Sequence, residues 1–141
     1  MSDEHHNEPR EVGYNKTHKD TFKEWTSKDS NSIFSGLTQA DLFFFAMALG
    51  HHRKKHSEVK NKANDVPVSA LNEAQKWGVL ATAIDAKEDL LVLKDEKKIY
   101  LSAEEYAEEG IKILKSHIEK QGLNYPKYLE AELRELIGDE S

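Results

Sequence analysis

Apolar residues recur along most of the chain at the three- and four-residue spacing of amphipathic helices. From this spacing we predict a mainly α fold, a compact bundle of about five helices at residues 17–26, 39–49, 69–85, 103–121 and 126–137. Residues 1–16 contain few apolar residues and no period, so we interpret them as a flexible N-terminal tail. A single helical domain over residues 17–138 and a disordered end at 139–141 complete the predicted organisation.

The second predicted helix carries the clearest boundary signals. Thr38 can cap its first turn while Asp41, three residues later, supplies the acidic partner of a capping box. The helix is apolar on nearly every face, which is typical of a helix in the middle of a domain. We predict Gly50 as its C-cap, because glycine enters the left-handed conformation without strain. A second capping box, Ser102 with Glu105, predicts the start of the 103–121 helix.

Two stripes of small and apolar residues predict the buried faces of the later helices. In the 69–85 helix the stripe consists of Leu71, Ala74, Trp77, Gly78, Ala81 and Ile84. In the 103–121 helix it consists of Tyr106, Ala107, Gly110, Ile111, Leu114 and Ile118. On the outside of that helix, Glu108 and Lys112 form a favourable pair four residues apart.

Two segments between the helices are harder to interpret. Residues 57–68 are polar and end near Pro67, which predicts a linker. Residues 90–101 hold two short apolar runs around a polar turn, as in a hairpin, but the turn lacks the glycine that hairpins favour. We favour a short helix and a turn there, and a small β-hairpin near 90–101 stays open.

Length and composition narrow the class of protein. A chain of 141 residues is long enough for one domain with a real core. The absence of cysteine excludes disulfides, thiolate metal sites and cysteine nucleophiles. The first residues lack the apolar stretch of a secretory signal, and the longest apolar run, 42–49, is far shorter than the roughly 20 residues of a membrane span. We therefore expect a cytoplasmic protein that makes no membrane contact.

The charge of the chain is unevenly distributed. The net charge of −6 lies entirely in residues 83–141, which hold 15 acids and 9 bases. Positive charge is most concentrated just after the second helix, in a group that we call the basic segment: His51, His52, Arg53, Lys54, Lys55, His56, Lys60 and Lys62. Lysine and arginine bind DNA phosphates without reading sequence, so the basic segment is the candidate nucleic-acid site. Cations also stabilise a helix C-terminus, so a solvated helix end is the alternative.

No catalytic or metal signature stands out. His52 and His56 have the spacing of a two-histidine chelate, but Arg53 stands where a metalloprotease has glutamate. Four acidic residues, Glu104, Glu105, Glu108 and Glu109, fit a solvated face near a helix start better than acid–base catalysis. The aromatic residues, at helical spacing, are expected in the core. We predict no metal and no cofactor and expect a non-catalytic protein, with a hydrolase or metal protein as the minor alternative.

Two segments resemble a known family. The stretch IFSGLTQADLFFFAMALGHHRKKH contains a phenylalanine before a turn, the acidic Asp41 opening an apolar helix, and an A-x-x-x-G end at residues 46–50. The later segment AEEYAEEGIKIL contains the pattern EEYA-x-x-G at residues 104–110. Together they resemble the dnd system-associated protein 4 family, also called DNA phosphorothioation-associated protein 4, over about residues 22–118. The resemblance implies association with a system that modifies DNA with sulfur or restricts unmodified DNA, and it implies no particular reaction.

Two hypotheses for the function follow. In the first, the chain is a non-catalytic accessory protein that binds other proteins of a dnd-type modification or restriction system. In the second, it is a small DNA-binding module that contacts phosphates through the basic segment.

Overall fold

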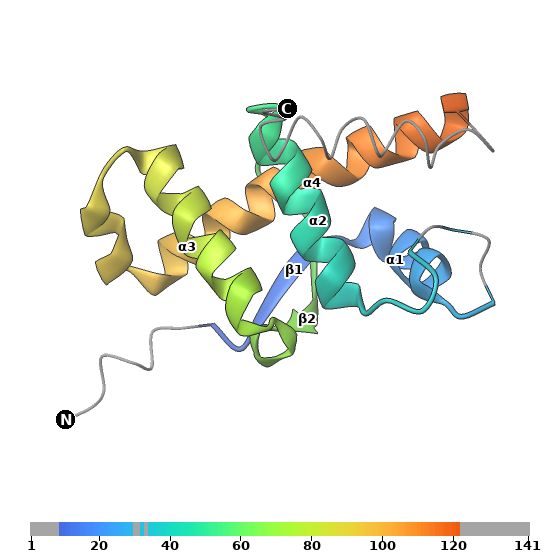
Figure 1. The fold of residues 1–141 in the computed structure, drawn as a ribbon, viewed down its shortest axis with the longest axis horizontal. Coiled ribbons are helices and arrows are strands. Elements are labelled where there is room, and N and C mark those ends of the chain that lie inside the picture. Colours follow the sequence, from blue (N-terminus) through green and yellow to red (C-terminus); the bar gives the residue numbers. More distant parts are fainter. Residues whose placement is uncertain (1–8, 30–31, 33, 122–141) are drawn as a thin grey trace, which may run out of the picture.

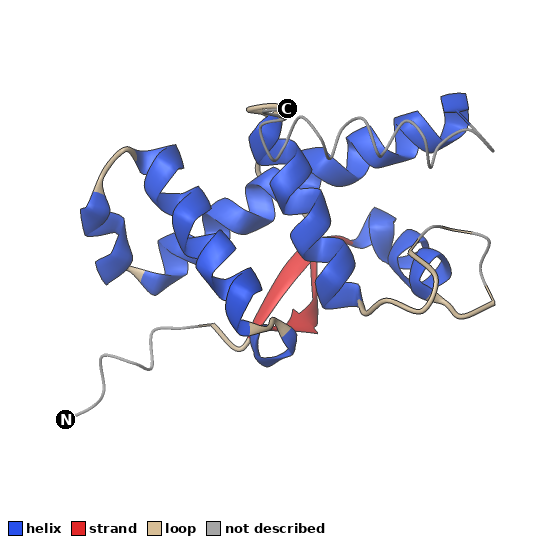
Figure 2. Cartoon of the chain, viewed as in Figure 1, coloured by secondary structure: helices blue, strands red, loops and turns tan. Residues whose placement is uncertain are grey.

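The computed structural model describes residues 9–29, 32 and 34–121, and these form a mainly α fold, as predicted (Figure 1). The α-helices are α1 (Lys19–Thr26), α2 (Gln39–His52), α3 (Glu73–Lys87) and α4 (Glu96–Gln121). Two strands, β1 (Glu11–Asn15) and β2 (Lys62–Pro67), and three short 3-10 turns, η2 (Lys16–His18), η3 (Val68–Ala70) and η4 (Leu90–Lys94), complete the described part (Figure 2). The predicted helix at 126–137 lies outside the described residues. None of the described helices is long and apolar enough to span a membrane.

Helix α2 crosses α4 at the centre of the molecule (Figure 1). Its buried residues, Ala40, Leu42, Phe43, Ala46, Met47, Leu49 and Gly50, make it the central helix that its apolar sequence predicts. At the crossing, a Cβ on Gly50 would clash with the backbone of Tyr106, and a Cβ on Gly110 would clash with the backbone of Ala46. Gly50 is therefore a packing residue inside α2, and its prediction as a C-cap was wrong. The helix runs on to His52, and Arg53 is the C-cap.

Of the two predicted capping boxes, one is formed and the other is not. The Thr38–Asp41 capping box is confirmed, with both of its hydrogen bonds formed. The box at Ser102 was wrong, because α4 begins at Glu96 and Ser102 is buried within it. Residues 90–94 form η4, so the preferred short helix is confirmed there, whereas residues 96–101 belong to α4; the hairpin near 90–101 is not formed.

A two-stranded antiparallel ribbon forms from two segments that were predicted to be the end of a flexible tail and part of a linker. Strand β1 pairs with β2, with Val12 opposite Val66 and Tyr14 opposite Ala63, and a bulge lies between Val12 and Tyr14. Val12 and Tyr14 are buried, and the Tyr14 ring stacks on Phe22 at 3.9 Å between centroids. Residues 11–15 thus belong to the folded body, and residues 62–67 are not linker. Each strand is short and pairs with a distant segment, so local periodicity carries little signal for either.

The buried face of α3 differs from the predicted stripe, whereas that of α4 agrees with it. In α3 the buried residues are Val79, Thr82 and Ala83, while Trp77 is 65% exposed. The helix starts at Glu73 behind a capping box of Asn72 and Gln75. It turns Val79 and Ala83 inward and leaves the Trp77 side open. In α4 the predicted residues Tyr106, Ala107, Gly110, Ile111 and Leu114 are buried, and Ile118 packs against the core.

Candidate functional site

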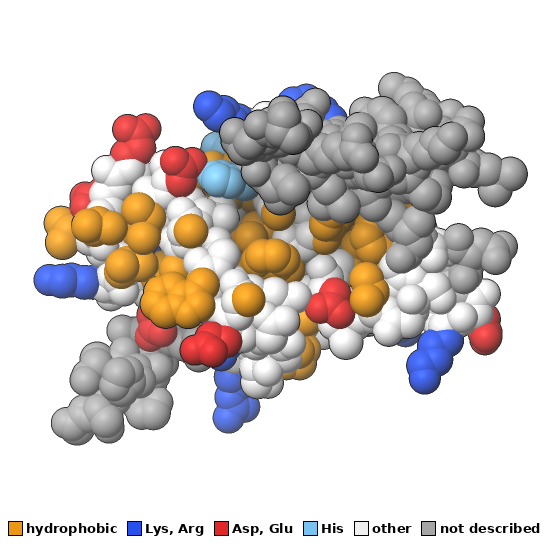
Figure 3. All heavy atoms as spheres, viewed as in Figure 1, with side chains coloured by type: hydrophobic (Ala, Val, Ile, Leu, Met, Phe, Trp, Pro, Cys, Tyr) orange, Lys and Arg blue, Asp and Glu red, His pale blue; other side chains and the backbone are white. Residues whose placement is uncertain are grey.

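Large hydrophobic side chains are exposed at the end of the molecule formed by α3, η4 and the start of α4. Figure 3 shows hydrophobic side chains gathered over this end, at the left of the view. We call the group the apolar surface and define it as Trp77, Leu90, Leu91, Leu93 and Leu101. Leu90 and Leu91 are 67% and 63% exposed. Leu91 and Leu101 line the same hollow, and exposed apolar side chains that gather in this way mark interaction sites in soluble proteins.

The local structure explains why three leucines point outward together. Asp89 caps η4 by accepting a hydrogen bond from the Leu91 backbone at 2.9 Å. In this tight 3-10 turn only Val92 is buried. A single inward residue in a five-residue turn leaves Leu90, Leu91 and Leu93 on the outside.

Two hollows flank Leu101 on α4. The larger, about 390 Å³, lies toward η4 and is lined by Lys87, Asp89, Leu91, Val92, Asp95, Lys98, Leu101, Ser102 and Glu105. The smaller, about 280 Å³, lies toward the ribbon and is lined by Pro9, Glu11, Lys62, Lys97, Tyr100, Leu101 and Glu104. Leu101 lines both and is 47% exposed, so it stands as a ridge between them.

Glu104 fastens the ribbon to α4. Its buried carboxylate accepts a hydrogen bond from the Gly13 backbone at 2.7 Å and lies 2.9 Å from Lys62 Nζ. The bulge beside Gly13 interrupts the ladder where this backbone N–H turns toward α4. Burial raises the pKa of Glu104, and the contacts with Lys62 and Gly13 offset this rise only in part.

Glu108, one turn further along α4, belongs to a second buried polar cluster. Its Oε2 lies 3.4 Å from His18 Nε2 and 3.5 Å from Lys112 Nζ. Lys115 Nζ lies 2.7 Å from the other ring nitrogen, Nδ1, of His18. With Lys115 charged, its ammonium donates to Nδ1, so the hydrogen bonding assigns the proton of a neutral His18 ring to Nε2 and directs it at Glu108. Burial alone would raise the pKa of Glu108, but the hydrogen bond and electrostatic contact with His18 and the charge of Lys112 together bring it below its usual value.

These two carboxylates correct the prediction of a solvated acidic face. Glu104 and Glu108 are 3% and 4% exposed, and each is tied to a residue of the N-terminal segment. The predicted pair of Glu108 with Lys112 is formed, but its acid is buried. Sequence reasoning missed His18 as a partner because it lies 90 residues away from Glu108. One signal was present, since Glu104, Glu108 and the core residue Ile111 share a helix face.

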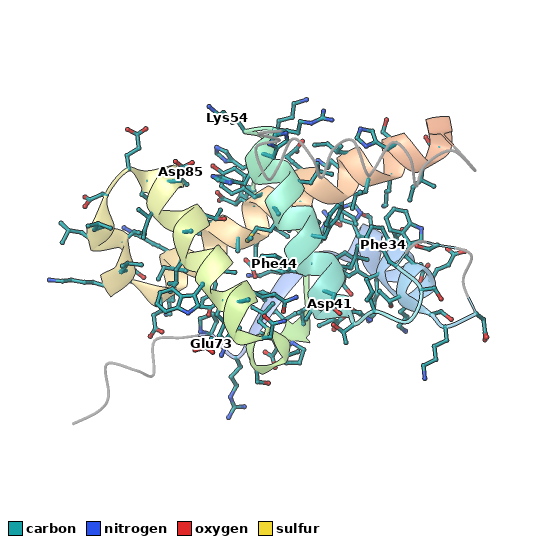
Figure 4. The ribbon with its side chains drawn as sticks, viewed as in Figure 1. Phe34, Asp41, Phe44, Lys54, Glu73 and Asp85 are labelled. Atoms are coloured by element: carbon teal, nitrogen blue, oxygen red, sulfur yellow. The ribbon has the colours of Figure 1, made fainter. Side chains whose placement is uncertain are left out.

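The structure divides the basic segment between paired and exposed residues. His51 Nε2 lies 2.7 Å from Asp85 Oδ2, and Asp85 points from the end of α3 toward α2 (Figure 4). His56 Nδ1 lies 3.7 Å from Glu105, and Lys62 is bound to Glu104. His52 and Arg53 also have interaction partners.

Three lysines of the basic segment remain exposed. Lys54, Lys55 and Lys60 are on the surface and have no ion pair with any residue of the described part of the chain. Lys54 follows the end of α2 in a left-handed conformation, with φ at 56°, and its side chain points away from the body (Figure 4). The candidate phosphate contacts are therefore concentrated in three lysines.

A two-histidine chelate would require His52 and His56 to lie one turn apart on the same helix, and they do not. His52 is the last residue of α2, so His56 does not lie one turn further along the same helix. Within residues 9–29, 32 and 34–121, no group of three or more histidine, cysteine or acidic residues is placed to hold a metal ion.

Comparison with known proteins gives one match. No curated protein and no solved structure matches the chain. The family model described as DNA sulphur modification system-associated protein 4 matches residues 12–137. The residues that carry this resemblance meet in the structure, since Ala46 and Gly50 of α2 pack against Gly110 and Tyr106 of α4. Over nearly its whole length, the chain belongs to the family of DNA sulphur modification system-associated protein 4.

Proposed function

We propose that this protein is a non-catalytic accessory component of a DNA sulphur modification system and acts by binding another protein of that system. The observation that carries the proposal is the apolar surface. Trp77, Leu90 and Leu91 are each more than 60% exposed, although large apolar side chains of this kind are suited to burial in a protein core. Burying such side chains against a partner is favourable by about 25 cal/mol for each Å² of apolar area.

The polar residues of the fold support a structural rather than a chemical role for its interior. The two buried carboxylates of α4 are engaged by Gly13, Lys62, His18 and Lys112. These contacts hold the ribbon and η2 against α4. A carboxylate bound in this way stabilises the fold, whereas Leu90, Leu91 and Leu93 lie outside the hydrophobic core of the described residues.

Binding to purified proteins tests the proposal. We expect the full chain to co-elute in gel filtration with at least one purified protein of the DNA sulphur modification system from the same organism. The double variant Trp77→Ala/Leu91→Ala should lose this co-elution, because both side chains lie on the apolar surface. The control is Leu37→Ala, since Leu37 is 45% exposed but precedes α2 and belongs to none of α3, η4 and α4. Failure of every protein of the system to bind would overturn the proposal.

A second candidate function is contact with DNA phosphates through Lys54, Lys55 and Lys60. It is supported by the exposure of these three lysines, which have no described ion pair. The other members of the basic segment are held by contacts within the chain. The acidic net charge of −6 disfavours binding over the whole surface, so any contact is local.

A salt titration tests the second candidate. At about 50 mM salt, duplex DNA should bind the wild type, and the logarithm of the affinity should fall linearly with the logarithm of the salt concentration. The variant Lys54→Ala/Lys55→Ala/Lys60→Ala should reduce the slope by about one for each phosphate that the protein no longer binds. The matched control replaces three other exposed lysines, Lys23, Lys28 and Lys94. Equal losses of affinity in both variants, or no binding at low salt, would exclude the basic segment as a site.

A further inference from the structure

We infer that the partner contributes an α-helix, which packs along the exposed face of α4 with Leu101 at the centre of the contact. This inference rests on the proposed function and specifies the kind of partner segment that the apolar surface receives.

The shape of the surface around Leu101 favours a helix. Leu101 is a ridge with a hollow of about 390 Å³ on one side and one of about 280 Å³ on the other. Helices pack by placing the side-chain ridges of one between those of the other. A water molecule takes up about 30 Å³, so each hollow has room for a large apolar side chain. A helix laid along α4 would place side chains in both hollows, with the Leu101 ridge between them.

The walls of the larger hollow supply the apolar contact. Leu91 and Val92 from η4 face it together with Leu101 from α4. Leu90 and Leu93, on the same turn of η4, extend the apolar surface beyond it. The partner helix would therefore bury a continuous apolar stripe of its own, with anchors spaced three and four residues apart.

The charges around the two hollows favour a protein over nucleic acid or an anionic membrane. Both hollows are lined by positively and negatively charged side chains. The charged residues of the larger hollow are Lys87, Lys98, Asp89, Asp95 and Glu105. In the smaller hollow the lining charges are Glu11, Lys62, Lys97 and Glu104. Phosphate-rich partners need an excess of positive charge, which neither hollow offers. A partner helix with an apolar stripe and both acidic and basic flanking residues matches this pattern.

The first experiment measures affinity for the partner. The probe is the purified protein of the modification system that co-elutes with the full chain. We expect Leu101→Glu to weaken its dissociation constant at least tenfold, because it places a charge at the centre of an apolar contact. Leu37→Glu is the matched control, since Leu37 and Leu101 are 45% and 47% exposed, and its affinity should stay within twofold of the wild type. Circular dichroism should show that both variants are folded.

The second experiment identifies the segment that lies over α4. A photo-crosslinking residue replaces Lys98, which is exposed at the edge of the larger hollow. Mass spectrometry should locate the cross-link within a helix of the partner that carries apolar residues three and four apart.

The outcomes separate the inference from the proposed function. A cross-link to a second copy of this chain, to its own residues 122–141, or to a non-helical segment of the partner overturns the inference and leaves the proposed function standing. So does an unchanged affinity of Leu101→Glu when Trp77→Ala/Leu91→Ala abolishes binding. If no protein of the modification system binds the wild type, the proposed function and the inference both fail.

Discussion

Gly110 of α4 lies so close to Ala46 of α2 that a Cβ at position 110 would overlap the Ala46 backbone carbonyl. One turn along the crossing, Gly50 lies against the backbone of Tyr106 in the same way. The two helices are thus in backbone contact at two points. Backbone atoms cannot rotate away from an added methyl group as a side chain can, so these positions require glycine for space rather than for backbone conformation.

Replacement of Gly110 by alanine should destabilise the protein. The added methyl group forces α2 and α4 apart, and overpacking of this kind costs about 1–3 kcal/mol or more. This cost should exceed the gain of about 1 kcal/mol that alanine brings to a helix interior. Urea denaturation measures the difference in the free energy of unfolding. The control is Gly78→Ala in α3, where the added methyl group meets only the ring of Phe44 (Figure 4), a half-buried side chain that can move. Equal stability of the two variants would contradict the backbone contact at Gly110.

Removal of His18 should destabilise the fold more than removal of Lys112. His18→Ala leaves the buried Glu108 carboxylate without its ring partner, and the loss of a hydrogen bond to a buried charged group costs about 1–3 kcal/mol or more. Lys112→Ala removes a side chain that is 52% exposed, so its effect should be below about 1 kcal/mol. Thermal or urea unfolding of the two variants gives the comparison. The double variant His18→Ala/Glu108→Ala should recover part of the loss, because it leaves no unpaired buried carboxylate. Destabilisation by Lys112→Ala as large as that by His18→Ala would refute this account.

Glu104 and Glu108 should give opposite dependences of stability on pH. The folded pKa of Glu108 is lowered, so between the folded and unfolded pKa values the unfolded chain binds more protons and stability rises with pH. The stability that Glu108 contributes is therefore present above the usual glutamate pKa of about 4.3 and is lost as pH falls through the folded pKa. The folded pKa of Glu104 is raised, so the folded protein holds the extra proton, and stability falls as pH rises through that range.

Unfolding free energies measured between about pH 3 and pH 6 test this difference, since the range brackets the usual glutamate pKa. The unfolding free energy of the wild type minus that of Glu108→Gln should increase with pH. The corresponding difference between the wild type and Glu104→Gln should decrease with pH. Each variant serves as the control for the other, because the two positions lie one turn apart on the same helix. Slopes of the same sign would rule out at least one of the two pKa shifts.

The capping boxes of α2 and α3 should each contribute about 1 kcal/mol to stability. Thr38→Val removes the hydroxyl that accepts the Asp41 backbone N–H at 3.0 Å, and Asn72→Ala removes the equivalent acceptor at α3. Gln75 also donates to Asp41 at 2.9 Å, so the two boxes are joined. We therefore expect the losses of the two variants to be non-additive in the double variant. Thr38→Ser, which keeps the hydroxyl, should match the wild type. Strict additivity would show that the boxes act independently.

Local signals in the sequence predicted the helical framework. The Thr38–Asp41 box and the stripe from Tyr106 to Leu114 are formed by residues three and four apart, so their geometry follows from neighbours in the chain. The EEYA-x-x-G pattern, part of the resemblance to the family that matches residues 12–137, ends at Gly110, which packs against α2. The face of α3 was not predictable in this way. Trp77 fits a helical stripe, and only the position of α3 against α4 leaves it on the surface.

Long-range pairing accounts for what the sequence did not reveal. The ribbon joins segments about fifty residues apart, and neither strand is long enough to show a clear period. The internal contacts of the basic segment were hidden for a related reason. Asp85, Glu104 and Glu105 contact members of the basic segment from other helices, and the spacing of residues within 51–62 carries no information about these contacts. The apolar surface was missed because exposed and buried leucines look alike in a pattern of hydrophobic positions.

The attachment of the N-terminal ribbon to α4 determines when this part of the molecule can form during synthesis. Gly13 and His18 bind residues that follow them by 91 and 90 positions, so their partners leave the ribosome long after they do. At about 5–20 residues per second, the delay is roughly 5–20 s. Throughout that interval Val12 and Tyr14 of β1, which are buried in the finished protein, have no α4 to pack against. The first segment of the domain to be made is thus among the last to be folded, and a nascent chain that stalls before α4 exposes an apolar strand to the chaperones and proteases of the cell.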